Sequence, residues 1–105
     1  MQASDEMIRH FLQAFKRALS RGDWEIVQRR AEYASVTQMN TDDIIMILMQ
    51  LTPDDYIAGP EVDRDRPTEL LWKFRRDQSD SDWLYIKLKY VSGLAKVISF
   101  HKSIY

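Results

Sequence analysis

The sequence predicts an α+β fold, with N-terminal helices packed on one face of a C-terminal antiparallel sheet. Two patterns support this prediction. Apolar residues recur at helical spacing in the first half of the chain, whereas from residue 69 onward they alternate with polar residues, as half-buried strands require. The chain has 105 residues, 45% of them hydrophobic, which is enough for one core, so we expect a single domain over residues 1–105.

Residues 4–21 form the clearest predicted helix. Ser4 suits the N-cap position, two acids follow in the first turn, where the helix dipole favours negative charge, and Gly22 can end the helix. His10 lies outside the apolar stripe and is expected to be solvated. The stripe itself, which should face the core, consists of Ile8, Phe11, Leu12, Phe15 and Leu19.

The segment that follows allows more than one interpretation. "WEIV" suits a short strand and "QRRAEYA" a short helix. A second helix is predicted over about residues 42–51, because Thr41 can cap it, acids occupy its first turn and its body is apolar. Pro53 then suits the first position of a short turn.

The last part of the chain is predicted to form a loop and three strands. Residues 59–68, "GPEVDRDRPT", contain the turn-forming residues of a loop. Beyond them the apolar period changes to two, and a turn is expected at Ser92-Gly93. The three strand candidates are "ELLWKFRR", "DWLYIKLKY" and "LAKVISFH".

The register of the last two strands follows from the need to bury one face. A two-residue loop at Ser92-Gly93 would place apolar side chains opposite polar ones: Leu84 opposite His101, and Ile86 opposite Ser99. A loop one residue longer, with Gly93 in a left-handed conformation, suits a hairpin with a bulge, and we predict this longer loop. It pairs the apolar residues with one another: Ile86 with Phe100, and Leu88 with Ile98.

The same register gathers polar residues from three strands on the opposite face. Tyr85 is expected opposite His101, and Lys87 opposite Ser99. The alternation in "ELLWKFRR" adds two cations from a neighbouring strand. This set, called the polar face below, consists of Lys73, Arg75, Tyr85, Lys87, Ser99 and His101.

The distribution of charge favours an anionic partner, although the net charge is only −1. Residues 1–63 carry 6 Lys or Arg against 11 Asp or Glu, whereas residues 64–105 carry 9 against 5. Such asymmetry is typical of a localised site for an anion such as nucleic acid. The chain has no cysteine, which excludes disulfides, thiolate metal sites and a cysteine nucleophile.

No segment resembles a targeting or membrane-spanning sequence. "MQASDEMIRH" lacks the basic and long apolar regions of a signal peptide, and "IIMILMQL" is too short to cross a bilayer. We therefore expect a soluble protein of the cytoplasm.

The polar face has the groups that metal-independent RNA cleavage requires. Histidine titrates near neutral pH and can take or give a proton, a tyrosine can do so beside ammonium groups, and cations stabilise the developing phosphorane charge. Trp83 could stack a splayed base. No metal ion or other cofactor is expected. The alternative from the residues alone is a solvated basic sheet surface without a function.

Four runs in this order resemble the MqsR family of toxins from bacterial toxin–antitoxin pairs: "LTPDDYIAGPEVDRDRP", "LLWKF", "LYIKLKY" and "VISFH". The resemblance covers roughly residues 41–102. It implies a RelE/barnase-like fold and a sequence-selective mRNA interferase, that is, an endoribonuclease of a type II toxin–antitoxin system. It also implies two partners, the mRNA substrate and a DNA-binding antitoxin encoded adjacently, and leaves open whether the ribosome takes part.

The resemblance assigns catalytic positions to Tyr85, His101 and Lys73. This chain has Ala58 where the best-known members have a lysine, Lys73 in place of a glutamine and His101 in place of a lysine. Ala58 favours the alternative function, a non-catalytic interaction module that binds an antitoxin or RNA. The residues expected to bind RNA are Arg64, Arg66, Arg75, Trp83, Lys87, Ser99 and Lys102.

Overall fold

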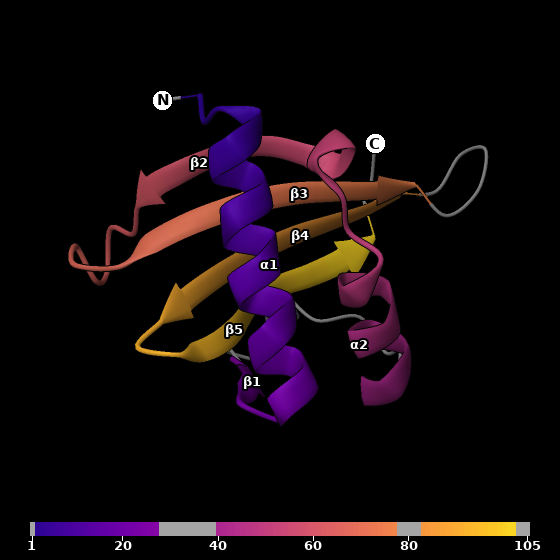
Figure 1. Ribbon diagram of the computed structural model, residues 1–105. Helices are drawn as coiled ribbons and strands as arrows, with labels where there is room; N and C mark the ends of the chain where they lie inside the picture. The colour runs from indigo at the N-terminus through magenta and orange to yellow at the C-terminus, as the bar shows by residue number, and fades with distance from the viewer. Residues whose placement is uncertain (1, 28–39, 78–82, 103–105) are drawn as a thin grey trace.

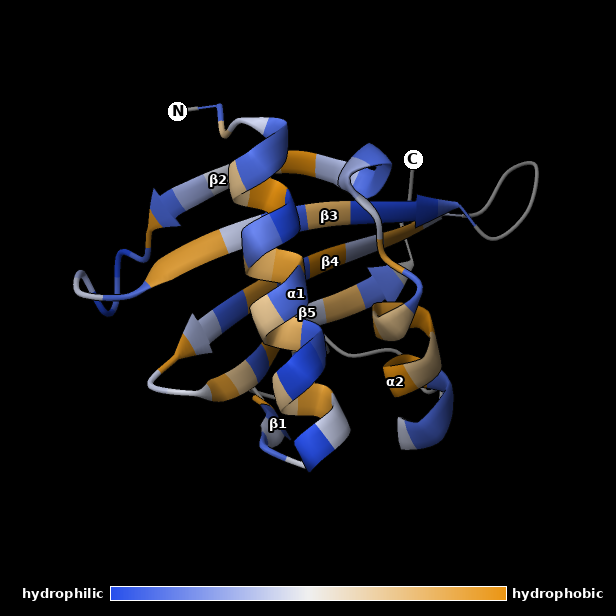
Figure 2. Cartoon of the chain, in the orientation of Figure 1, coloured by the Kyte–Doolittle hydropathy of each residue, from blue (hydrophilic) through white to orange (hydrophobic). Residues whose placement is uncertain are grey.

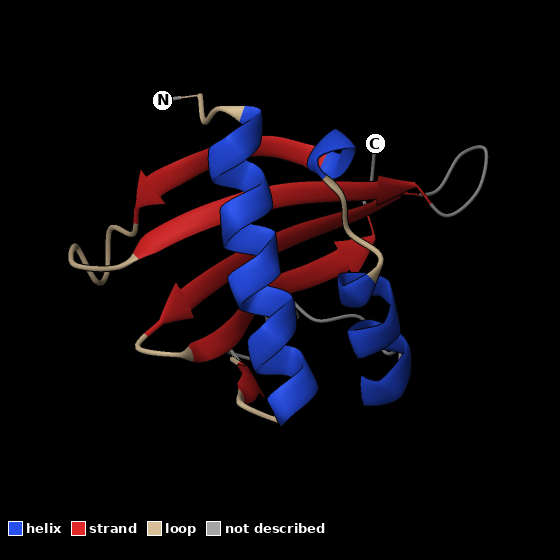
Figure 3. Ribbon diagram, in the orientation of Figure 1, coloured by secondary structure: helices blue, strands red, loops and turns tan. Residues whose placement is uncertain are grey.

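The computed structural model describes residues 2–27, 40–77 and 83–102 (Figure 1). The predicted α+β fold is confirmed, with helices lying against one sheet (Figure 3). Within the described residues there are two α-helices and a five-stranded sheet of order β1-β5-β4-β3-β2. Strand β1 runs parallel to β5, and all other neighbours are antiparallel. The elements are α1 (Asp5–Arg21), β1 (Trp24–Ile26), α2 (Thr41–Met49), the 3₁₀ turn η2 (Pro53–Asp55), β2 (Tyr56–Val62), β3 (Leu70–Asp77), β4 (Trp83–Val91) and β5 (Leu94–Lys102).

Helix α1 lies across the sheet and forms with it most of the hydrophobic core (Figure 1). Its predicted ends are confirmed: the Ser4 side chain accepts a hydrogen bond from the Met7 N–H, and Gly22 ends the helix with φ of 82°. All five residues of the predicted stripe are buried. The alternation of polar and apolar faces along α1 is visible in Figure 2. Phe11 stacks on Trp72 of β3 with ring centroids 4.5 Å apart.

The middle of the chain agrees with the predictions except at the ends of α2. This helix is capped by Asn40, not Thr41: the Asn40 side chain accepts from the Asp43 N–H at 2.9 Å. The short strand β1 and the turn at Pro53 are present, whereas the predicted helix "QRRAEYA" lies outside the described residues. Neither described helix is long and apolar enough to cross a membrane.

The predicted loop over residues 59–68 is wrong in its first part, because β2 continues to Val62. Gly59 and Pro60 are accommodated at irregularities of this edge strand, where the register shifts twice between Tyr56 and Glu61. Proline is tolerated on an edge strand, where a ladder hydrogen bond is dispensable. The Tyr56 hydroxyl donates a hydrogen bond to the Gly59 carbonyl oxygen and so links two residues of this irregular stretch.

The predicted three-residue loop between β4 and β5 is also wrong. Val91 pairs with Leu94, so the loop has two residues, Ser92 and Gly93, with φ of 51° and 83°. Positive φ at both positions is the signature of a type I′ turn, whose twist matches a hairpin. The predicted pairing of Ile86 with Phe100 is confirmed, but Leu88 pairs with Val97.

Burial of the apolar residues of β4 and β5 requires one extra residue between the paired segments. This residue lies within β5 and not in the loop. The register shifts between Lys87 and Leu88, so Ile98 is an added residue of β5, a β-bulge. A bulge at this point and a loop one residue longer both shift the pairing of β5 with β4 by one residue, so residues 99–102 have the same partners in either case. This equivalence explains why the predicted facing of Tyr85 and His101 is right despite the wrong loop.

Replacement of Gly59 by alanine should lower the free energy of unfolding by about 2 kcal/mol or more. A Cβ there would lie 2.6 Å from the Leu71 carbonyl oxygen, at a φ of 117°. Gly22→Ala is the matched control, because its φ of 82° is also positive but a Cβ meets nothing within 4 Å. It should cost about 1 kcal/mol. The free energies of unfolding are measured by urea denaturation. Equal decreases for Gly59→Ala and Gly22→Ala would contradict the close approach of β2 to β3.

Candidate nucleic-acid interface

Strand β4 divides its side chains between the core and the polar face. Leu84, Ile86 and Leu88 are fully buried, whereas Tyr85 and Lys87 are only half-buried and point to the other side of the sheet. The polar face forms two cross-strand rows: Arg75, Tyr85 and His101 in the first, and Lys73, Lys87 and Ser99 in the second. The structure thus brings together the six residues predicted to share this face.

The first row carries a continuous series of rings and cations. The Tyr85 and His101 rings are stacked with centroids 5.6 Å apart and an interplanar angle of 29°. Trp83 follows on the same strand, its ring centroid 6.4 Å from that of Tyr85. The guanidinium of Arg75 lies 4.4 Å from the Trp83 ring centroid, a cation–π contact. Flat rings beside cations suit unstacked bases and phosphates.

Two cations of the polar face are paired with carboxylates that the sequence did not indicate. Lys73 Nζ lies 2.9 Å from Glu61 Oε2 of β2, and Arg75 Nε lies 3.2 Å from Asp77 Oδ1. The hydrogen bond to Glu61 raises the pKa of Lys73, against an opposing effect of burial, and the same bond lowers the pKa of Glu61. Both groups are therefore charged at neutral pH.

A buried ionic cluster lies beyond these rows. Lys89 is 3% exposed and donates to the carboxylates of Asp63 and Glu69, with 2.9 Å to Glu69 Oε1. Burial is the largest single influence and lowers the pKa of Lys89, but the two hydrogen bonds outweigh it, so its pKa is raised. The cluster fixes the connection between β2 and β3, whose ends are joined by the bond from Asp63 N–H to the Glu69 carbonyl oxygen at 3.1 Å.

The remaining predicted RNA-binding residues are less central. Arg64 and Arg66 are exposed on the β2–β3 connection, outside both rows. Ser99 is 7% exposed, which leaves little of it for a nucleotide to contact. Lys102 ends β5, and its side chain lies outside what the structure describes. Ala58, at the position where the family has a lysine, pairs directly with Lys73.

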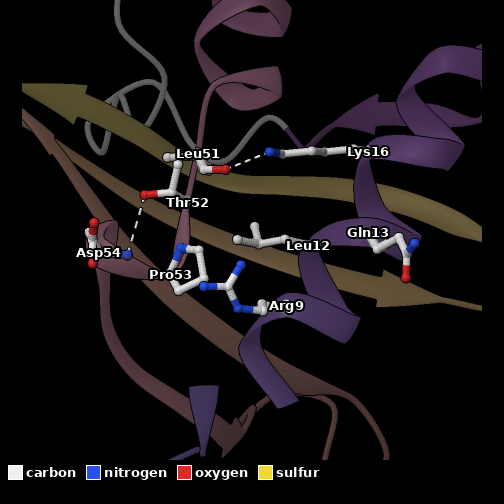
Figure 4. Close-up of a pocket in the computed structure, with 8 residues that line it drawn as sticks. All are labelled: Arg9, Leu12, Gln13, Lys16, Leu51, Thr52, Pro53 and Asp54. Carbon is white, nitrogen blue, oxygen red and sulfur yellow. Dashed lines mark hydrogen bonds between the residues drawn. The ribbon is translucent and has the colours of Figure 1, made fainter. Parts of the chain in front are cut away.

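A cavity of about 570 Å³ lies between α1 and the segment that follows α2 (Figure 4). Lys16 donates to the Leu51 carbonyl oxygen at its rim, and burial lowers the pKa of this lysine. None of its lining residues belongs to the polar face. Within the described part of the chain, no three His, Asp or Glu side chains gather in a way that could hold a metal ion.

Comparison with known proteins assigns no family and no function to the chain. No protein-family model matches the chain, and no curated protein is significantly similar to it in sequence. The resemblance to the MqsR family therefore stays a prediction.

Lys89→Met should lower the free energy of unfolding by about 3–5 kcal/mol, because two carboxylates would stay behind without their buried cation. The matched control is Lys96→Met on the same sheet face. Lys96 Nζ is 3.7 Å from Glu25, which is half-exposed, so its loss should cost less than about 1 kcal/mol. Thermal and urea denaturation of both variants measure the difference, and similar small losses would contradict the burial of the cluster.

Proposed function

We propose that this protein is the toxin of a type II toxin–antitoxin system, an endoribonuclease that cleaves mRNA in the cytoplasm without a metal ion. The observation that carries the proposal is the stacked pair of Tyr85 and His101 in one row with Arg75, beside the row of Lys73 and Lys87. Two groups able to transfer protons thus lie next to three cations on the same face of three neighbouring strands. The resemblance to the MqsR family supports the same function through Tyr85, His101 and Lys73.

The proposed reaction begins with attack of a ribose 2′-oxygen on the adjacent phosphorus. One side chain of the Tyr85–His101 pair accepts the proton of the 2′-hydroxyl as the P–O2′ bond forms. The other donates a proton to the 5′-oxygen as the P–O5′ bond breaks. The products are a 2′,3′-cyclic phosphate and a free 5′-hydroxyl, with no change of oxidation state.

The cations have a separate role in this reaction. The ammonium groups of Lys73 and Lys87 and the guanidinium of Arg75 stabilise the negative charge that accumulates on the non-bridging oxygens. The Trp83 ring, which is in cation–π contact with Arg75, would stack on a base next to the scissile phosphate. Arg64 and Arg66 would contact more distant phosphates along the strand. Substrate recognition then depends on single-stranded RNA, whose bases can leave the stack.

The second candidate function is a non-catalytic module that binds an antitoxin or RNA. Two observations favour it: Ala58 lies opposite Lys73, where a further cation is missing, and Glu61 neutralises Lys73. Such a module would bind RNA in a salt-sensitive manner and leave it intact.

Tyr85→Phe and His101→Ala should each reduce cleavage of single-stranded RNA by about 100-fold or more, since each removes a group that transfers a proton. The purified proteins are incubated with a labelled RNA, and the products are analysed for 2′,3′-cyclic phosphate ends. His10→Ala is the matched control: this histidine is exposed on α1, and its loss should leave the rate unchanged.

Wild-type rates in both folded variants would show that the Tyr85–His101 pair is not catalytic. Intact RNA with the wild-type protein, together with salt-dependent binding, would instead identify the non-catalytic module. Circular dichroism of each variant establishes that loss of activity is not loss of folding.

A further inference from the structure

Glu61 of the edge strand β2 lies beside the polar face and is paired with one of its lysines. Its carboxylate is 2.9 Å from Lys73 Nζ, and the charge of Lys87, which pairs with Lys73 across β3 and β4, also lowers the pKa of Glu61. Lys73 of β3 thus has the Glu61 carboxylate on its β2 side and Lys87 on its β4 side, and a carboxylate bound to an accessible lysine occupies the place that a phosphate oxygen can take. Its side chain is 41% exposed and that of Lys73 is 23% exposed, so solvent and ligand can reach the pair.

The irregularity of β2 turns Glu61 toward this face. Ala58 pairs with Lys73, and an unbroken ladder would then put Pro60 opposite Leu71. The register shift between Ala58 and Glu61 adds one residue, so that Glu61 takes this position and shares the face of Lys73. Bulges commonly redirect a side chain in this way, because a shift of one residue exchanges the two faces.

Two other lysines of this sheet surface, Lys89 and Lys96, are paired differently. Lys89 is 4% exposed in its side chain and has two carboxylate partners that are themselves largely buried, so a ligand cannot replace them. Lys96 and Glu25 are 3.7 Å apart at the β1 edge, a looser contact. The Lys73–Glu61 pair combines a short contact with access, and a half-exposed pair of this kind is weak enough for a ligand to break.

We propose that Glu61 is an intramolecular competitor of RNA, a carboxylate that holds Lys73 until a phosphate of the bound strand displaces it. The inference rests on the proposed RNA-binding role of the polar face, but not on cleavage. Glu61 thereby lowers the affinity for every phosphate-bearing ligand and selects for strands that make enough other contacts to take Lys73. Its removal should strengthen binding.

The test compares the affinity of the wild-type protein and Glu61→Gln for a single-stranded oligonucleotide with 2′-O-methyl riboses. This probe lacks the nucleophile, so binding is measured without cleavage. Glu61→Gln should bind about two- to fivefold more tightly at low salt, the factor expected for release of a partly exposed ion pair. The advantage should shrink as salt is raised, because salt screens the pair.

Two controls isolate the mechanism. Glu25→Gln makes the same change of charge on the same sheet surface, beside Lys96, and should alter affinity by less than Glu61→Gln. In a Lys73→Met background the effect of Glu61→Gln should disappear, since the cation for which the two anions compete is gone. A double-mutant cycle of the wild type, Glu61→Gln, Lys73→Met and the double variant measures the coupling between Glu61 and Lys73 in RNA binding.

The possible results separate the inference from the proposed function. Equal gains from Glu61→Gln and Glu25→Gln, or a gain that persists with Lys73→Met, would overturn competition at Lys73. Weaker binding by Glu61→Gln would also overturn it and would show that the carboxylate contacts the nucleic acid itself. Binding by the wild type with no change in the variant refutes the competitor alone, whereas no binding by any of the proteins refutes the RNA-binding face as well.

Discussion

The pairing of β4 with both of its neighbours is the constraint on which the rest of the structure depends. Ile86 lies between Phe74 of β3 and Phe100 of β5, and all three side chains are fully buried. A slip of one residue would exchange the two faces of β4, burying Tyr85 and Lys87 and exposing apolar side chains. Burial of the core therefore fixes the side of the sheet on which Tyr85 and Lys87 lie.

The electrostatics of that side are mixed, because carboxylates accompany its cations. Lys73 forms an ion pair with Glu61, and Arg75 forms one with Asp77. Lys89 is buried together with its two acidic partners, Asp63 and Glu69. The buried cluster shapes the β2–β3 connection, whereas the accessible pairs can exchange partners with a ligand. Such a surface attracts a polyanion less strongly than its lysines and arginines alone would, and its contacts depend on geometry as well as on charge.

The sequence predicts the parts of this molecule that follow from local patterns. The capping residues and apolar stripe of α1 are such patterns. The alternation in β3, β4 and β5, with one face buried, is sufficient to place six residues together on the other face. Strand β2 was missed because Gly59-Pro60 has the local pattern of a loop, and only pairing with β3 keeps it extended. The position of the bulge at Ile98 was missed because a longer loop satisfies the same apolar pattern. The partners of Lys89 were missed because Asp63 and Glu69 lie 26 and 20 residues away in the chain.

The most direct test of the account is to locate bound RNA on the folded protein. Backbone amide chemical shifts are recorded while a single-stranded 2′-O-methyl oligonucleotide is added. The account predicts the largest changes at residues 73–75, 83–87 and 99–101, with little change along α1. Changes concentrated around Arg9 and Lys16, at the cavity on the helix side of the sheet, would contradict it, as would the absence of any change.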